Sequence, residues 1–259
     1  MAQPPLTPEE LKQPPLDGDP FIRQLRSQMT EKYPSPPPFY QALYEGRLGR
    51  QDLELWVGEL YPYWDNLHYA VGGVFVKTND EELRTNILKK LVDVEGKDVA
   101  RHFSGLTTPA YEELWLRFAD GLGMPRGEVL AWRPFTRTYY AIETLKLYSH
   151  GYEWTWLDGL ASLYAGDLHN QECLGRAYTA LRDIYRVPDQ RLEFFRVYLA
   201  DVAEHLAWEK PALAYLCCST ERQHTAAKAF RERLDIENQL LVATEMMRTG
   251  APIPAAVPA

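Results

Sequence analysis

The sequence predicts an all-α protein that forms a compact bundle of seven to nine helices. Apolar residues recur with a helical period through most of residues 19–248, and no run alternates apolar and polar residues as strands do. Proline and glycine clusters interrupt this pattern, yet no glycine- or serine-rich linker divides the chain. We therefore expect one helical domain at residues 19–248, between a flexible proline-rich arm at 1–18 and a flexible tail at 249–259.

Breaker and capping residues set the expected boundaries in the first half of the chain. Pro20 suits the first turn of a helix, and the proline-rich stretch at 34–38 ends that helix. Gly46 ends a short helix, and Asn79 with Asp80 caps a later one. The expected ranges are 19–33, 39–45, 50–76, 79–103 and 109–122.

The second half of the chain follows the same rules. Gly123 and Pro125 end the preceding helix, and Pro188 opens a long helix that Pro211 is expected to kink. The expected ranges are 126–149, 153–168, 170–186, 188–218 and 220–248.

Charge and composition exclude several classes of partner. The net charge is −8, whereas nucleic-acid binding favours a basic stripe. The longest apolar run is far shorter than the ~20 residues that span a bilayer, and the N-terminus lacks the basic and apolar regions of a signal peptide. The cysteines, Cys173, Cys217 and Cys218, form no metal or disulfide framework. We therefore expect a cytoplasmic protein with neither a nucleic-acid nor a membrane partner.

Several carboxylates and histidines lie close together within predicted helices. Carboxylates and histidines that face inward from different helices of a bundle can hold two iron or manganese ions. Ordinary surface charges and helix caps are the competing interpretation. The pairs are Glu95 with His102, Asp167 with His169, and Asp201 with His205.

Aromatic residues are abundant, with seven tryptophans and sixteen tyrosines. They indicate a core or a cavity with aromatic walls. Aromatic side chains at helical spacing more often pack in a core than bind a substrate. The candidate substrate-binding residues are Tyr61, Trp64, His68 and Tyr140.

Four segments resemble the heme-oxygenase-like helical fold, and within it the PqqC branch of the TenA/PqqC group. They are 39–57 (FYQALYEGRLGRQDLELWV), 160–171 (LASLYAGDLHNQ), 192–205 (LEFFRVYLADVAEH) and 230–247 (FRERLDIENQLLVATEMM). The resemblance covers most of residues 20–248. It implies a single helical domain and a homodimer.

The resemblance offers three chemistries: metal-free oxidation by quinone synthases, di-iron oxidation, and hydrolysis by thiaminases with a cysteine nucleophile. The synthase pattern W-V-x-N-R-F-Y-Y-Q matches residues 56–64, where Leu60 replaces the arginine and Trp64 the glutamine. The cationic clamp for a tricarboxylate precursor is therefore missing. The cysteines lie outside the thiaminase context, so we rank that activity low.

The di-iron relatives carry a glutamate and a histidine seven residues apart on one helix, and Glu95 and His102 have that spacing. Seven residues are about two helical turns, so both side chains would share a face. The next motif, L-Y-A-x-(D/E), ends here at Asp167. The resemblance thus implies these three residues as iron ligands.

The last di-iron motif, H-x-x-x-(D/E)-x-x-H, is altered in this chain. Its closing histidine is His205, but Tyr198 replaces the opening histidine and Val202 the carboxylate. Asp201 precedes the expected carboxylate by one residue and lies one turn before His205. The resemblance therefore implies two irons, one iron or none.

We expect an oxidoreductase that uses dioxygen on a small organic substrate, possibly amino-acid-derived or aromatic, in the biosynthesis of a cofactor or specialised metabolite. Its iron ligands would be Glu95, His102, Asp167, Asp201 and His205. Tyr198 would ligate iron or supply an electron. One alternative is a metal-free oxidase in which His169, Tyr198 and His205 act and the histidine moves protons. Another is a non-catalytic binding or regulatory protein.

Overall fold

The chain forms helices almost throughout. A computed structural model describes residues 7–96, 108–151 and 154–250, and these ranges contain ten α-helices and no strand. The prediction of an all-α fold is confirmed. The helices are α1 (Gly18–Lys32), α2 (Pro38–Tyr44), α3 (Arg50–Lys77), α4 (Glu81–Glu95), α6 (Tyr111–Leu122), α7 (Arg126–Leu130), α8 (Thr136–His150), α9 (Trp156–Asp183), α10 (Glu193–Leu216) and α11 (Thr220–Thr249).

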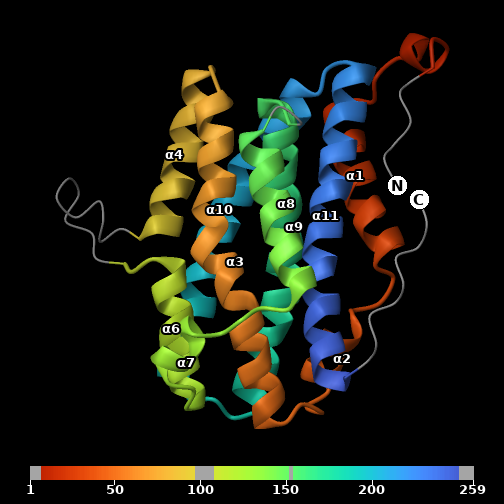
Figure 1. The fold of residues 1–259 in the computed structure, drawn as a ribbon. Helices are drawn as coiled ribbons and strands as arrows, with labels where there is room; N and C mark the ends of the chain where they lie inside the picture. The colour runs from red at the N-terminus through yellow and green to blue at the C-terminus, as the bar shows by residue number, and fades with distance from the viewer. Residues whose placement is uncertain (1–6, 97–107, 152–153, 251–259) are drawn as a thin grey trace.

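The long helices run alongside one another, with α4 and α6 on one side of the bundle and α1 on the other (Figure 1). Helix α9 packs against α10, α11 and α3. Every residue from Leu157 to Asn170 is buried, so this part of α9 has no solvent-exposed face. A helix that is covered on all sides can carry functional side chains toward several neighbours.

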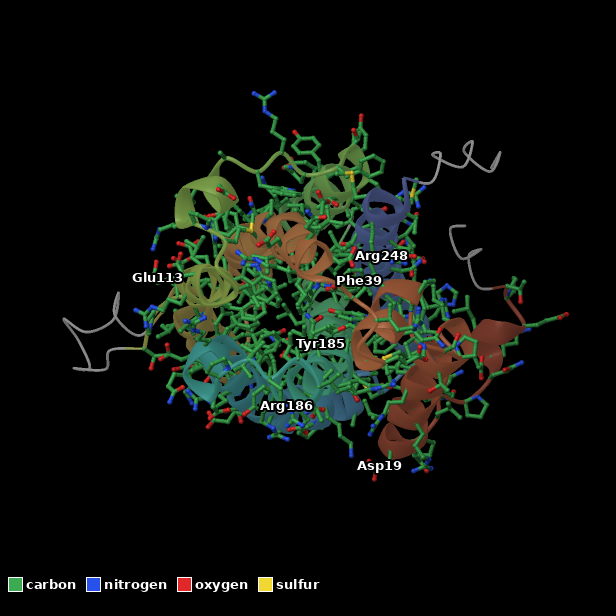
Figure 2. The ribbon with its side chains drawn as sticks, turned by 90° about the horizontal axis from the view of Figure 1, so that it is seen from below. Asp19, Phe39, Glu113, Tyr185, Arg186 and Arg248 are labelled. Carbon is green, nitrogen blue, oxygen red and sulfur yellow. The ribbon has the colours of Figure 1, made fainter. Side chains whose placement is uncertain are left out.

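An aromatic core fills one end of the bundle. The rings of Trp56 and Trp115 meet edge to face with centroids 5.3 Å apart, and Phe194 stacks on Tyr198 at 5.5 Å. Viewed along the helices, side chains fill the space between the ribbons, and Asp19 lies at the outer edge (Figure 2). The abundant aromatic residues therefore serve mainly to pack the core, as the competing interpretation held.

Three helix boundaries differ from the prediction. The ranges 153–168 and 170–186 form one helix, because residues 156–183 contain no proline to interrupt it. The range 126–149 is divided into α7 and α8, because Pro134 lies between them. The long helix begins at Glu193, after a short 3-10 turn at Asp189–Leu192.

Part of the predicted arm contacts the bundle. Leu16 exchanges backbone hydrogen bonds with the Gln223 side chain on α11, and Thr220 donates to the carbonyl of Gln13. Within the described ranges, no helix combines the length and apolarity that crossing a bilayer requires.

Candidate functional site

Three helices bring a buried charge cluster together inside the bundle. Lys90 extends from α4, Asp167 from α9 and Glu209 from α10, and all three are buried. The Lys90 Nζ donates hydrogen bonds to Asp167 Oδ2 and, over 2.8 Å, to Glu209 Oε1. Buried charges are tolerated only when they are paired, so this mutual contact is what permits the cluster.

His205 extends the cluster from one turn earlier on α10. Its Nδ1 lies 3.2 Å from Asp167 Oδ2, and its Nε2 lies 3.0 Å from Asp93 Oδ2. The imidazole therefore lies between two carboxylates. Asp201, one further turn back, accepts a hydrogen bond of 3.1 Å from the Tyr111 hydroxyl.

The members of the cluster shift one another's pKa values. Burial raises the pKa of the Glu209 carboxyl to about 7, although Lys90 opposes this shift. Burial also acts to raise the pKa of Asp167, but Lys90 and His205 outweigh burial and hold that pKa below its usual value. Burial and Lys90 act to lower the pKa of His205, and its two carboxylate neighbours outweigh both and raise it.

A second buried network lies beside the cluster. Arg233 on α11 donates through Nε to Glu237 Oε1 over 2.8 Å and through Nη2 to the Tyr63 hydroxyl over 2.6 Å. Asn170 on α9 donates to the hydroxyls of Tyr63 and Tyr198, over 3.2 and 3.1 Å. The Arg233 Nη1 is buried and has no hydrogen-bond partner among the described residues.

Both networks border one internal cavity of about 10 Å³, room for a single water or a molecule of similar size. Cationic, acidic and phenolic groups face this small space together. Its polar lining residues include Lys90, Asp167, His205, Arg233, Tyr63 and Tyr198. A cavity with this lining can stabilise a small anion and exchange protons with it.

The described residues do not fit an iron centre. No three or more His, Cys, Asp or Glu side chains among them are arranged to hold a metal ion. The reason is visible at Lys90, whose ammonium donates to Asp167 and Glu209, the carboxylates that a cation would need.

Two of the predicted iron ligands lie elsewhere or beyond the described ranges. Glu95 is the last residue of α4, its side chain is 44% exposed, and its Oε1 lies 3.5 Å from the Nδ1 of His68. His102 lies outside the described residues. Of the predicted ligands, the structure brings Asp167 and His205 together, with Asp201 one turn before His205 on α10.

Tyr198 and His169, the two predicted catalytic residues, face different spaces. Tyr198 lines the internal cavity. His169 is two residues after Asp167, which turns its side chain by roughly 200° around α9. Its Nε2 lies 3.5 Å from Cys173 Sγ, and its buried Nδ1 has no partner among the described residues.

The predicted substrate-binding residues do not gather into one pocket. Trp64 is buried in the aromatic core, whereas Tyr140 is 65% exposed on α8. Tyr61 is half-buried, and burial followed by the nearby charge of Asp65 raises its pKa to about 12. His68 is half-exposed beside Glu95.

The sequence contains a signal for Lys90 that the spacing of carboxylates and histidines does not include. Leu83, Ile87 and Val94 belong to the buried stripe of α4, and Lys90 occupies the position of that stripe between Ile87 and Val94. A lysine at a core position must be paired. Arg233 and Glu237 carry the same signal, because their spacing of four residues on a buried face of α11 predicts an ion pair.

Comparison with known proteins agrees with this fold. The model of the TENA/THI-4/PQQC family matches residues 23–247. A pyrroloquinoline-quinone synthase from Pseudomonas aeruginosa is 28% identical over 116 residues, 45% of this chain and 43% of the relative. The synthase from Acidiphilium cryptum is 29% identical over 125 residues, 47% and 48% of the two chains. The matches thus span less than half the length of these relatives.

Solved structures match over more of the chain. A heme-oxygenase-like domain of unknown function from Shewanella denitrificans superposes with a TM-score of 0.70 and 15% identity, covering 93% of this chain and 99% of that one. A TenA homologue from Pyrococcus furiosus gives a TM-score of 0.61 at 14% identity, covering 88% and 98%. At such identities these likenesses show the shared fold and no more.

Proposed function

The chain belongs to the TENA/THI-4/PQQC family, and we propose that it is an oxidase that passes two electrons and two protons from a small organic substrate to dioxygen. The substrate becomes oxidised by two electrons, and dioxygen becomes hydrogen peroxide. The name of its relatives, pyrroloquinoline-quinone synthase, supports an oxidative role. The observation that carries the proposal is the small cavity with two buried cations, Lys90 and Arg233, in its wall.

Lys90 and Arg233 are positively charged, and dioxygen becomes negatively charged when it accepts electrons. Reduced dioxygen is an anion, and donors that are already oriented in a water-poor site stabilise such an anion strongly. Arg233 has an unpartnered Nη1, and Lys90 keeps its charge because Asp167 and Glu209 raise its pKa against the opposing effect of burial. The cavity has the size of a small diatomic molecule or water.

His205 supplies the proton path in this proposal. Its ring lies between Asp167 and Asp93, so a proton given up by one nitrogen can be replaced through the other. Tyr198 lines the same cavity, and its phenol either donates a proton or relays an electron from the substrate to dioxygen, after which the substrate restores the phenol. If Tyr198→Phe leaves both activity and optical spectrum unchanged, Tyr198 has no such part.

The proposal contains no resident metal. In this site the Lys90 ammonium provides the positive charge that metal ions supply in di-iron carboxylate proteins. The substrate of a true quinone synthase is not proposed, because Leu60 and Trp64 leave its carboxylates without a clamp. Iron at Glu95 and His102 stays a prediction that metal analysis tests.

The test uses full-length protein from cells grown with added iron. Metal content is measured first, and we expect iron well below one atom per chain. Dioxygen uptake and hydrogen peroxide formation are then followed with a panel of electron-rich aromatic and amino-acid-derived compounds, with and without a chelator. We expect uptake that the chelator does not inhibit, and its loss in Lys90→Met.

Lys89→Met is the matched control, because Lys89 is adjacent in sequence and exposed. Folding of both variants is checked by circular dichroism. Stoichiometric iron whose removal abolishes activity would replace this proposal with the iron-dependent one. A folded protein that binds panel compounds and consumes no dioxygen with any of them would favour a binding protein.

A further inference from the structure

A second group of reactive side chains lies on the other face of α9. Cys173 and His169 are one helical turn apart, and the thiol Sγ lies 3.5 Å from the imidazole Nε2. The thiol is partly exposed, whereas His169 is only 7% exposed. A thiol beside a histidine nitrogen has a ready acceptor for its proton, which is what a nucleophilic cysteine needs.

This pair borders a pocket that is separate from the internal cavity. The pocket holds about 170 Å³ and is bordered by α9, the ends of α1 and α2, and the proline-rich segment at 33–37. Tyr33 meets the His169 ring edge to face at 6.3 Å, and Tyr44 donates a hydrogen bond of 2.9 Å to the Cys173 carbonyl. Two tyrosine rings and the prolines therefore give it apolar walls.

One cation lies at the rim of this pocket. The Arg176 guanidinium stacks 4.1 Å from the centre of the Tyr44 ring and is exposed. Within the described part of the chain, Arg176 makes no ion pair, although the exposed Glu172 also lines the pocket. A guanidinium that lies over an aromatic ring, one turn from a thiol, is suited to an acid group of a small ligand.

The buried His169 Nδ1 gives a second and independent indication of a ligand. It has no hydrogen-bond partner among the described residues. A buried polar atom without a partner costs free energy, so it is expected to be paired in the working state.

We propose that Cys173 is the reactive thiol of a second small-molecule site, which takes a small anionic compound with an electrophilic carbon. Arg176 pairs with the acid group, and the sulfur attacks the carbon. A carbon–sulfur bond forms, the bond to the leaving group breaks with its electron pair, and the thiol proton passes to His169. No electrons are exchanged with an outside oxidant.

The probes are iodoacetate and iodoacetamide, which share a leaving group and differ in charge. The rate of alkylation at each cysteine is followed by peptide mass spectrometry in the unmodified protein. Cys218 is the internal control, because it is exposed and lies 3.8 Å from Arg222 but has no histidine beside it. We expect Cys173 to react faster than Cys218 despite its lower exposure. At Cys173, the ratio of the iodoacetate rate to the iodoacetamide rate should be about fivefold higher in the unsubstituted protein than in Arg176→Gln.

Two substitutions assign the roles. His169→Asn should slow both reagents at Cys173 by about tenfold or more, because the proton acceptor is lost. Arg176→Gln should lower the iodoacetate rate alone. Arg182→Gln is the control, since Arg182 also stacks on a tyrosine of α9, at 5.3 Å, outside the pocket.

Cys173 alkylation that is no faster than that of Cys218 overturns the proposal, as does a reagent ratio at Cys173 that Arg176→Gln leaves unchanged. The first result is obtained with folded, unsubstituted protein, so a folding defect cannot produce it. Alkylation is measured without turnover, so the outcome is independent of the proposed oxidase activity.

Discussion

Lys90 is the residue that most distinguishes this interior from a metal-binding one. Its ammonium is buried and contacts the carboxylates of Asp167 and Glu209. A further basic group beside these carboxylates is His205, which lies next to Asp167. A point charge on a flexible stem can fill the space of a metal ion without needing coordination geometry. This arrangement depends on the lysine, because its loss leaves the buried negative charges of Asp167 and Glu209 without a compensating positive charge.

Lys90→Met should therefore destabilise the fold by about 3–5 kcal/mol, the usual effect of removing one partner from a buried ion pair. Lys89→Met, on the exposed face of α4, should change stability by less than about 0.5 kcal/mol. Urea unfolding followed by tryptophan fluorescence measures both. Equal effects of the two substitutions would mean that the buried pairing contributes nothing.

Glu209 makes stability depend on pH. Its pKa rises from an ordinary value near 4.5 to about 7 on folding, chiefly through burial. The native state then binds more protons than the unfolded state between those pH values, so the free energy of unfolding falls as pH rises through this window. The fall is on the order of 3 kcal/mol if Glu209 acts alone. His205, whose pKa is also raised, acts in the same direction above its usual pKa.

Glu209→Gln should flatten this fall, because the neutral amide does not titrate. Glu204→Gln, on the exposed face of the same helix, should leave it unchanged. Urea unfolding at pH 5, 6, 7 and 8 gives the comparison. Stability of the unsubstituted protein that rises across this range would contradict the assignment of Glu209.

At the scale of elements, α9 carries the site because small residues let other groups approach it. A Cβ atom added at Gly166 would lie 2.7 Å from the Arg233 Nη2, and one at Gly159 would lie 2.6 Å from a Val74 methyl group. Gly166 thus admits the guanidinium that borders the cavity. Glu59 stabilises the start of α8, because its carboxylate accepts hydrogen bonds there from Phe135 N and Thr138 Oγ1.

Gly166→Ala should destabilise the protein by about 1–3 kcal/mol, because the added methyl group displaces the Arg233 guanidinium and its hydrogen bonds. Gly175→Ala is the matched control on the same helix, where a Cβ meets nothing within 4 Å. It should stabilise the protein by up to about 1 kcal/mol, as alanine favours helix more than glycine does. Thermal unfolding measures the stability of both variants. A loss of stability in both would show that helix propensity does not determine the effect of alanine at Gly175.

At the scale of the whole molecule, exposed apolar side chains follow the outer faces of α3 and α8. Val76 is 71% exposed on α3, and Tyr140 and Leu147 are 65% and 58% exposed on α8. The two helices pack against each other, and Tyr140 and Leu147 are seven residues, or two turns, apart. Exposed apolar surface of this kind favours burial against another chain.

We therefore expect the homodimer that the family resemblance implies, with α8 in the interface. Sedimentation velocity should give twice the chain mass of 29.9 kDa for the unsubstituted protein. Leu147→Glu should give the single-chain mass, whereas Leu88→Glu, at an exposed leucine on α4, should not. A mass of one chain across the accessible concentration range would rule the dimer out.

The helical period, the breakers and the quoted segments were enough to predict the fold class and the family. They also identified Asp167, Tyr198 and His205 as residues of interest, since these follow family motifs on long helices. They did not reveal Glu209, because a charged residue within a helix looks the same in sequence whether it faces solvent or another charge. The stripe position of Lys90 and the four-residue spacing of Arg233 and Glu237 indicate pairing, but they do not say which groups on other helices lie beside these residues.

What the sequence determined by itself is which residues share a helix face, because helical geometry depends only on spacing along the chain. What the tertiary structure alone decided is which faces meet. Packing of α4, α9 and α10 placed a lysine among carboxylates where iron was expected. The turn of α9 directed Asp167 and His169 into different spaces. Such pairings join residues far apart in the chain, 119 positions for Lys90 and Glu209 and 170 for Tyr63 and Arg233, and local spacing carries no information about them.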